Sequence, residues 1–460
     1  MIGRFGAACA RWAQRWVPHP FVFAILLNVL VLIVGMIVWR GQDSSPVKGV
    51  LAAWYDGFWT SGLLAFGFQM ALILVTGYAV AGAPLTRRLL DRLAGLWTTP
   101  RQAVALTAAV SVILSWLHWG LGLVGAAFLA REVASVARRR RTPIPYPLIC
   151  ASAYAGFLVW HGGLSGSAPL VVAQASHSLS DLIGTVPLSQ TVLAPGNLVL
   201  SAVLLAVIPL ILAAMTAHAP LSIPPAAMEA EGADAEEGGS SPAARWNRSG
   251  WVTLAVLVPA FLLAGWILVP GWVSGGRGFD LNAVLFVFLF AGLALHRSPL
   301  AYVRAIQSGA GEAGGILLQF PFYFALLGVM KASGLVALLS DAGVAVSLRL
   351  ASVGLPADGV YRSLTFLVAG LVNLFVPSGG GQWAVQGEIV VRGALDPQIH
   401  AGVGRSVMAL AYGDAWTNML QPFWALVLLS VTGTRARDIL GYTMALMVLV
   451  APVYLIYFWF

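Results

Sequence analysis

The chain has 460 residues, of which 59% are hydrophobic and only 10% are charged, whereas soluble proteins carry about 25% charged residues. This composition excludes an ordinary soluble domain and indicates a protein with many membrane-spanning segments. The net charge of +8 does not indicate a nucleic-acid partner, because the basic residues form short clusters between apolar runs, as in the positive-inside pattern. Two cysteines are too few for a disulfide framework or a metal site, and no cofactor is expected.

Apolar runs of span length recur between basic loops in residues 1–217, the predicted first repeat. Arg4, Arg11 and Arg15 precede the first run, which places the N-terminus in the cytoplasm. That run is too long for the apolar part of a signal peptide and is interpreted as a retained span. The predicted elements are spans at 21–39 and 63–83, a hairpin at 103–130, a broken span at 147–173 and a span at 197–217.

The segment 103–130 fits neither one crossing nor two. One crossing would place Arg138–Arg141 outside, against the charge rule. Two crossings would need about 40 apolar residues, and roughly 28 are present. A re-entrant hairpin resolves the conflict, with two arms of about 13 residues that enter from the cytoplasm and turn near the midplane. Its tip would be SWLHWGLG, whose exposed backbone must face protein or a wet cavity.

The broken span at 147–173 is interrupted by WHGGLSGSAP, and the loop 174–196 contains no Lys or Arg, as an external loop should. Residues 218–250 are polar, acidic and rich in Pro, Gly and Ser, which predicts a disordered cytoplasmic linker. Residues 251–460 would hold an extra span at 251–269 and the second repeat, with spans at 281–295 and 315–340, a hairpin at 363–391, a broken span at 405–430 and a span at 441–460.

Both halves follow one order of elements, and the extra span inverts the second half relative to the first. The second hairpin would enter from outside, and the C-terminus would be external. The four breaks, at 115–122, 160–168, 377–383 and 412–422, would meet at one site, which is typical of secondary transporters. The predicted fold is an all-α polytopic membrane protein with about ten full spans. It has an inverted-topology repeat, two opposed re-entrant helical hairpins and two broken transmembrane helices.

Several stretches resemble a known family: WVPHPFVFAILL, WYDGFW, FGFQMALILVTG, FPFYF, NLFVPSGGGQWAVQG and AYGDAWTNMLQPFWAL. They are similar to the bacterial short-chain fatty acid uptake transporters of the ion transporter superfamily, which are associated with acetoacetate and butyrate. The resemblance runs along the whole chain except the acidic linker. It implies an inner-membrane homodimer, with a scaffold domain, a mobile domain that holds both hairpins, and an elevator-type motion.

A short-chain fatty acid needs donors for two carboxylate oxygens and a small apolar pocket. No Arg or Lys lies at the four breaks, so the donors are expected to be half-helix N-termini and free backbone amides. Trp119, Trp383 or Trp416 would shape the pocket for the tail. The predicted substrate-binding residues are Ser378, Gly379, Gly380, Gly381, Gln382, Trp383, Trp116, His118, Trp119, Gly120, Ser165, Gly166, Ser167, Asn418 and Gln421.

Asp414 is the acidic residue within the centre of a broken span, and carboxylates at such depth are costly and usually functional. With Thr417 and Asn418 it is predicted to bind the coupling cation, either H⁺ or Na⁺. Related carriers show a Ser-Asn-Thr tripeptide at their hairpin tips, whereas PSGGG and WHWGLG stand here, so the choice of cation stays open.

Other interpretations of these residues remain open. The histidines His118 and His161 are equally compatible with hydrogen bonds between neighbouring helices, and the tryptophans with an interfacial belt. Gln69 and Gln319 are as compatible with bracing the hairpins as with contacting substrate. A carrier for dicarboxylates or other organic anions and a passive anion channel are the alternative functions. A membrane enzyme is disfavoured, because no metal cluster or nucleophile–base spacing is evident.

Overall fold

The computed structural model describes residues 20–39, 45–224, 241–269, 280–374, 379–420 and 424–459. Over these ranges the chain is helical, and its only β-type pairing is an isolated bridge between Ile144 and Ser222. Eight helices of the described part are long and apolar enough to cross a membrane. The protein is therefore an all-α, multi-pass membrane protein.

Three helices open the described chain: α2 (Pro20–Ile37), α3 (Pro46–Phe58) and α4 (Ser61–Gly82). The sequence analysis did not anticipate α3, which begins behind the N-cap Ser45 and carries Pro46 in its first turn, a position where proline loses no hydrogen bond. A corresponding group in the second half consists of α15 (Leu281–His296), α16 (Pro299–Ala310) and α17 (Gly314–Ser333).

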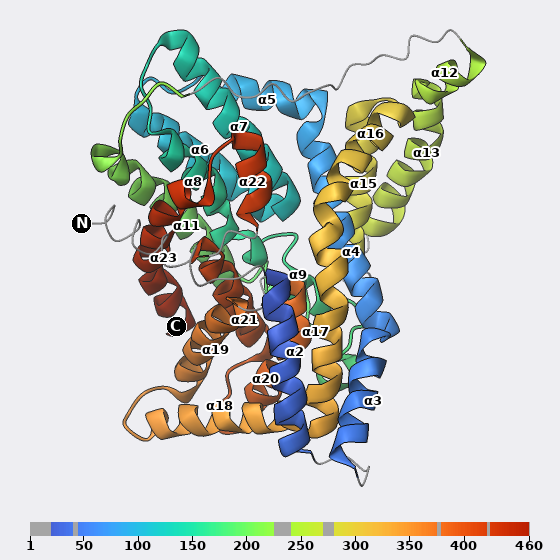
Figure 1. Ribbon diagram of the computed structural model, residues 1–460, viewed down its shortest axis with the longest axis vertical. Helices are drawn as coiled ribbons and strands as arrows, with labels where there is room; N and C mark the ends of the chain where they lie inside the picture. Colours follow the sequence, from blue (N-terminus) through green and yellow to red (C-terminus); the bar gives the residue numbers. More distant parts are fainter. Residues whose placement is uncertain are drawn as a thin grey trace.

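Two connecting helices lie across the spans rather than along them. They are α5 (Pro84–Ala94) and α18 (Leu335–Ala351), and Figure 1 shows α5 near the top of the molecule and α18 at the bottom. The span predicted at 315–340 therefore ends early, at Ser333. Gly334 has a φ of 82°, and this left-handed conformation, which glycine adopts without strain, ends α17 and lets the chain turn into α18.

The first hairpin consists of α6 (Pro100–Leu117) and α7 (Trp119–Arg140), joined by the extended residue His118. Its arms have 18 and 22 residues and are longer than the expected arms of about 13 residues. A capping box between Thr99 and Gln102 starts α6 before the apolar run. The arginines at the end of α7 suit the negative end of the helix dipole, so the helix continues through them.

The second hairpin consists of α19 (Ala357–Asn373) and α20 (Gly379–Ala394). The part of its predicted tip at 375–378, which includes Ser378, lies outside the described residues. In the first hairpin, the arms α6 and α7 pack on each other. In the second hairpin, the arm α19 packs closely on α21 (Val403–Thr417), which belongs to the second broken span.

Both predicted broken spans are interrupted in the structure. The first consists of α8 (Tyr146–Tyr154), the 3₁₀ turns η1 (Ala155–Leu158) and η2 (Trp160–Gly162), and α9 (Ser167–Val172). The second consists of α21, η7 (Asn418–Leu420) and α22 (Ala425–Thr432). Their unwound segments leave backbone groups free to bond outside the helices.

The remaining helices complete the two halves. They are α10 (Ser180–Ile183), η3 (Leu188–Gln190), α11 (Pro195–Met215), η4 (Thr216–His218), α12 (Pro242–Asn247), α13 (Gly250–Leu263) with the π-helical turn η5 (Ala264–Leu268), η6 (Gly311–Ala313) and α23 (Ala436–Trp459). Most of the predicted linker, residues 225–240, lies outside the described residues.

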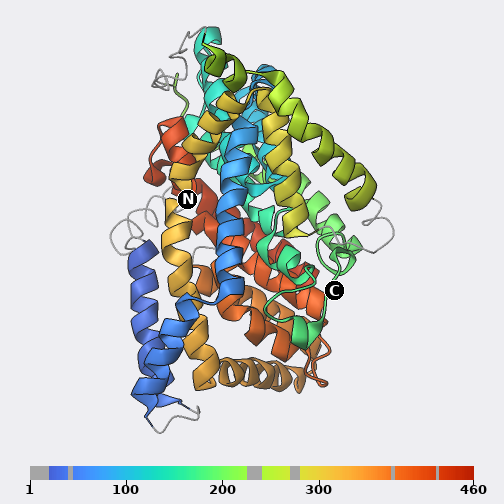
Figure 2. The ribbon, with the colours of Figure 1, turned by 90° about the vertical axis from the view of Figure 1, so that its right-hand side faces the viewer.

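The helices form two groups that Figure 1 shows side by side. The picture has α2, α3, α4, α13, α15, α16 and α17 on one side, and the hairpins, the broken spans, α11 and α23 on the other. Figure 2, turned by 90°, shows α4 and α17 running lengthwise in front of the hairpin helices. The long helices α4 and α17 contact both groups, since α4 packs on α7 and α17 packs on α20.

Candidate functional site

The two broken spans meet through one buried pair of side chains. The Nδ1 atom of His161 in η2 lies 3.2 Å from the Oδ2 atom of Asp414 in α21, and both side chains are fully buried. The backbone N–H of Ala168 donates to Nε2 of His161 at 3.2 Å. Because Nε2 accepts a hydrogen bond, we assign the proton of the neutral ring to Nδ1, which then donates to Asp414.

The carboxylate of Asp414 is only half satisfied. Its Oδ1 atom is buried and has no hydrogen-bond partner among the described residues. A carboxylate in this setting needs a further proton or cation to offset the cost of its burial. The Asp414 carboxylate can therefore bind one more positively charged partner.

A cluster of oxygen atoms surrounds the break in the second half. The Nδ2 atom of Asn373, at the end of α19, lies 2.8 Å from the backbone oxygen of Asp414, 3.0 Å from Oγ1 of Thr417 and 2.9 Å from Oδ1 of Asn418. Thr417 in turn donates to the backbone oxygen of Gly370 at 2.8 Å. Carbonyl, hydroxyl and amide oxygens are the ligands of hard cations, so this cluster could hold a cation if the amide of Asn373, which now bonds to all three oxygens, moved away.

Different contacts fasten the first hairpin to the first break. The backbone N–H of Trp119 donates to Oγ of Ser165 at 2.8 Å, and the N–H of Leu164 donates to the backbone oxygen of Trp116 at 2.7 Å. These bonds satisfy backbone groups that the helix ends leave free. Ser165 and the backbone of Trp116 therefore hold the tip of the hairpin in place.

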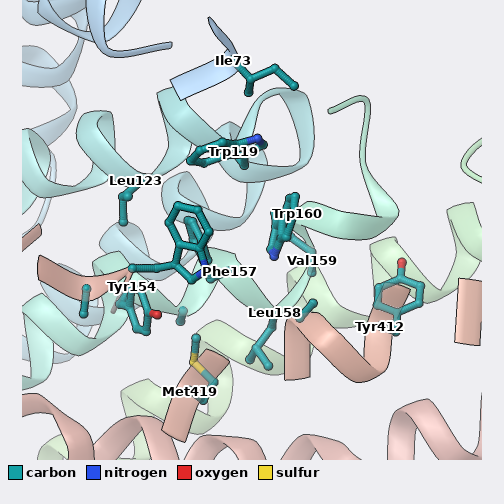
Figure 3. Close-up of a cluster of buried hydrophobic side chains, with 14 of the residues drawn as sticks. Ile73, Trp119, Leu123, Tyr154, Phe157, Leu158, Val159, Trp160, Tyr412 and Met419 are labelled. Carbon is teal, nitrogen blue, oxygen red and sulfur yellow. The ribbon is translucent and has the colours of Figure 1, made fainter. Parts of the chain in front are cut away.

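A small cavity lies between the first broken span, the two hairpins and the helices α4 and α17. Its volume of about 10 Å³ is room for roughly one water molecule. Four of the predicted substrate-binding residues line it, namely Trp119, Ser167, Gly379 and Gly380. The other lining residues are Met70, Phe157, Trp160, Ile316, Phe320 and Trp424. Figure 3 shows Trp119, Trp160 and Phe157 within one cluster of buried side chains, with Tyr412 farther away.

Several of the predicted residues do not line this cavity. His118 stacks on Phe288 of α15, with ring centroids 3.7 Å apart, and accepts a bond from the N–H of Leu121. The Nε2 atom of Gln382 donates to the backbone oxygen of Ala369 and to Gln386, so this side chain braces the hairpin. The lining also omits Trp116, Gly120, Ser165, Gly166, Gly381 and Asn418, and Gln421 lies outside the described residues.

A wider opening of about 640 Å³ lies between α4, α17, α20 and the loop after α9. Trp383 lines this opening rather than the small cavity. Lys331 lines it too and forms an ion pair of 2.7 Å with Glu388 of α20, which Arg392 also contacts at 2.8 Å. The predicted role of Trp416 is not supported by its contacts, since its Nε1 donates to the backbone oxygen of Met447.

Sequence reasoning missed three features of the site. Asn373, which bonds to the break in α21, was not singled out, because a single asparagine within an apolar run carries no spacing signal. Trp160, the first residue of the WHGGLSGSAP break, was weighed as an interfacial belt residue but was not named as a binding residue. Met70 and Phe320 come from α4 and α17; Gln69 and Gln319 had suggested that these helices reach the hairpins, but not which of their side chains face the cavity.

No group of three or more His, Cys, Asp and Glu side chains that could hold a metal ion was found among the described residues. The oxygen cluster around Asn373 belongs to a different class of site, because its ligands would be neutral oxygens with the single carboxylate of Asp414. Such ligands suit an alkali cation rather than a transition metal.

The fold defines the class of protein. A transporter named YdaH of Alcanivorax borkumensis superposes with a TM-score of 0.59 at 18% identity, covering 96% of this chain and 97% of the other. MtrF of Neisseria gonorrhoeae, described as illuminating a class of antimetabolite efflux pumps, gives 0.58 at 16% identity, covering 98% of this chain and 96% of the other. The chain thus has the fold of these membrane transporters.

The sequence comparisons then identify the family. The chain belongs to the short chain fatty acid transporter family, whose model matches residues 1–460. A relative from Escherichia coli K12, named as a candidate short-chain fatty acid transporter, is 38% identical over 96% of both chains. A relative of the same name from Haemophilus influenzae Rd is 35% identical over 100% of both chains. The predicted family is confirmed.

Proposed function

We propose that the protein is a secondary active transporter of short-chain fatty acids such as acetoacetate and butyrate, driven by H⁺ or Na⁺. The observation that carries this proposal is the small cavity beside the first break. It is walled by apolar rings and neutral donors and has no Arg or Lys among its lining residues. A small carboxylate with an apolar tail matches such a wall, whereas a ligand with several charges does not.

The coupling cation is assigned to the second break. Oδ1 of the Asp414 carboxylate has no partner among the described residues, and Thr417 and Asn418 provide oxygen atoms that share the amide of Asn373 with the backbone oxygen of Asp414. A proton on the carboxylate or a Na⁺ at this break would neutralise the buried charge. His161 bonds to Asp414 and stacks on Trp160 of the cavity wall, so occupancy of the two sites would be linked.

The proposed architecture is an inverted repeat that moves by an elevator mechanism, in a homodimer within the inner membrane. Support comes from the order of elements: a span, a transverse helix, a hairpin, a broken span and a closing span follow one another in both halves. The transverse helices α5 and α18 lie at opposite ends of the molecule in Figure 1. The hairpins and broken spans would move as one body against α4 and α17.

The test is uptake of labelled butyrate by purified protein in proteoliposomes. The proposal predicts accumulation above the equilibrium level when an inward H⁺ or Na⁺ gradient is imposed. Uptake that merely equilibrates, whatever the gradient, would identify a passive anion channel instead. Uptake of succinate in preference to butyrate would favour a carrier of dicarboxylates.

The proposed orientation has its own test. An N-terminus in the cytoplasm and an external C-terminus require residues 174–196 to face outside and residues 218–249 to face inside. Single cysteines placed in these two segments should react with a membrane-impermeant reagent from opposite sides. Labelling of both segments from the same side would contradict the topology but would leave the proposed substrate unaffected.

A further inference from the structure

The small cavity is lined by three buried hydrogen-bond donors that have no partner. The Nε1 atoms of Trp119 and Trp160 and the Oγ atom of Ser167 make no hydrogen bond among the described residues. Trp119 and Trp160 are 3% exposed and Ser167 is 1% exposed. A buried donor without an acceptor is costly, and three of them on one cavity wall indicate that a ligand supplies the missing acceptors.

The start of α20 reaches the same wall. A Cβ atom at Gly379 would lie 2.7 Å from Cη2 of Trp160, and one at Gly380 would lie 2.6 Å from the ring of Phe66. Only glycine lets the backbone approach these rings so closely. The backbone of α20 at Gly379 and Gly380 therefore forms part of the cavity wall.

The rest of the wall is apolar. Met70 and Phe320 come from the long helices α4 and α17, and Phe157 comes from the first broken span. A second charged group on a ligand would face these side chains without a partner, which is strongly unfavourable.

We propose that the carboxylate of the substrate is held by neutral donors alone: the indole N–H groups of Trp119 and Trp160 and the hydroxyl of Ser167. A carboxylate offers about four acceptor positions, which is enough for these three donors. The site therefore takes compact monocarboxylates and rejects dicarboxylates. This inference rests on the proposed function and names the residues that recognise its substrate.

Binding requires the cavity to widen, because it now has room for about one water molecule. Met70 is the most adaptable part of the wall, since its unbranched thioether side chain changes shape at little cost. A Cβ atom added at Gly380 would lie 3.1 Å from Cγ of Met70, so this side chain lies against the start of α20. Its withdrawal would open space for a short tail beside the donors.

The experiment measures equilibrium binding of labelled butyrate to the purified full-length protein. Trp160→Phe keeps an aromatic ring but removes the indole N–H together with the five-membered ring, and Ser167→Ala removes only a hydroxyl. Each should weaken binding about tenfold or more, as expected for a hydrogen bond to a charged group. The controls are Trp97→Phe, which removes an unpartnered indole N–H far from the cavity, and Ser152→Ala, whose hydroxyl bonds within α8.

Reduced affinity in both test variants, with wild-type affinity in both controls, supports the assignment. Wild-type affinity in Trp160→Phe and Ser167→Ala overturns it, because the unpartnered donors would then not contact the carboxylate. Comparison of succinate with butyrate on the wild type checks the rejection of dicarboxylates. If the wild type binds no monocarboxylate at all, the proposed function fails, and this outcome is distinct from either result with the variants.

Discussion

The break in the first half and the break in the second half lie against each other, yet their polar groups differ in kind. Around the first break, the groups left without a partner are donors, on Trp160 and Ser167. Around the second, the amide of Asn373 gathers the backbone oxygen of Asp414 and the side-chain oxygens of Thr417 and Asn418. Among the described residues, the groups without a partner there are Oδ1 of the Asp414 carboxylate and the donor Nδ2 of Asn418. The two broken spans occupy the same place in the order of elements of their halves. One of them thus provides a surface suited to an anion, and the other a surface suited to a cation.

On the proposed function, this difference would let one site couple two ions. His161 connects the two surfaces, because it bonds to Asp414 and stacks on Trp160. An anion and a cation on the two surfaces would stabilise each other in a medium of low dielectric constant. The following predictions alter one surface at a time, beginning with the largest expected effect.

Replacing Asp414 by Asn should abolish accumulation of butyrate above equilibrium. Asparagine keeps an oxygen that can accept the bond from His161 but carries no charge to bind a cation. Exchange of internal for external butyrate should persist in part, since the donor surface is intact. Uptake driven by an ion gradient, compared with exchange in the same proteoliposomes, measures this. Asp341→Asn, on the exposed part of α18, is the matched control, and normal accumulation by Asp414→Asn would remove this residue from coupling.

Replacing Gly379 by Ala should weaken butyrate binding about fivefold or more, because overpacking costs typically 1–3 kcal/mol. The new Cβ would lie 2.7 Å from both His161 and Trp160, so α20 must move away from the anion surface. Gly82→Ala adds the same group on α4, where nothing lies within 4 Å. An unchanged dissociation constant for Gly379→Ala would show that the start of α20 does not border the bound substrate.

Replacing Asn373 by Ala should lower the free energy of unfolding by about 1–3 kcal/mol, as for other buried hydrogen-bond networks. The change removes the amide that contacts Asp414, Thr417 and Asn418. Thermal unfolding in detergent reports the loss, and the cation concentration for half-maximal uptake should rise as well. Asn282→Ala removes an exposed amide that bonds only to Gln69, and should change neither quantity. Equal melting temperatures for the two variants would contradict a role for Asn373.

Replacing Lys331 by Gln should have the smallest effect. Its ion pair with Glu388 is partly exposed, with 39% of the lysine side chain accessible, and such pairs contribute about 0–1 kcal/mol. The rate of uptake should fall less than about fivefold at low salt and recover at high salt, where charges on the wide opening are screened. Lys48→Gln on α3 is the control. A complete loss of uptake would mean that Lys331 contacts the substrate in the cavity.

Much of the fold could be predicted from residue patterns because lipid imposes long apolar helices. The breaks at WHGGLSGSAP and AYGDAWTNMLQP were visible as polar, glycine-rich interruptions. The helices α3, α5, α16 and α18 were missed because they are short or amphipathic and resemble loops in a search for spans. The early end of α17 depends on the single residue Gly334, whose left-handed conformation no hydropathy pattern reveals.

The site was predicted in outline but not in detail. Glycine and serine at the breaks led to Ser167, Gly379 and Gly380, which line the cavity. His118, Gln382 and Trp116 were equally plausible, because a sequence shows that a side chain is polar and near a break but not which way it points. The bond between His161 and Asp414 spans 253 residues, and such a contact depends on packing that one sequence cannot reveal.

The central claim is that a monocarboxylate and a cation cross the membrane together through this site. The most direct test is the ratio of internal to external butyrate in proteoliposomes of the wild-type protein, with an inward H⁺ gradient, an inward Na⁺ gradient, or neither. The account predicts a ratio above one with at least one of the gradients and a ratio of one without them. A ratio of one under all three conditions, in vesicles that still take up butyrate, would contradict it.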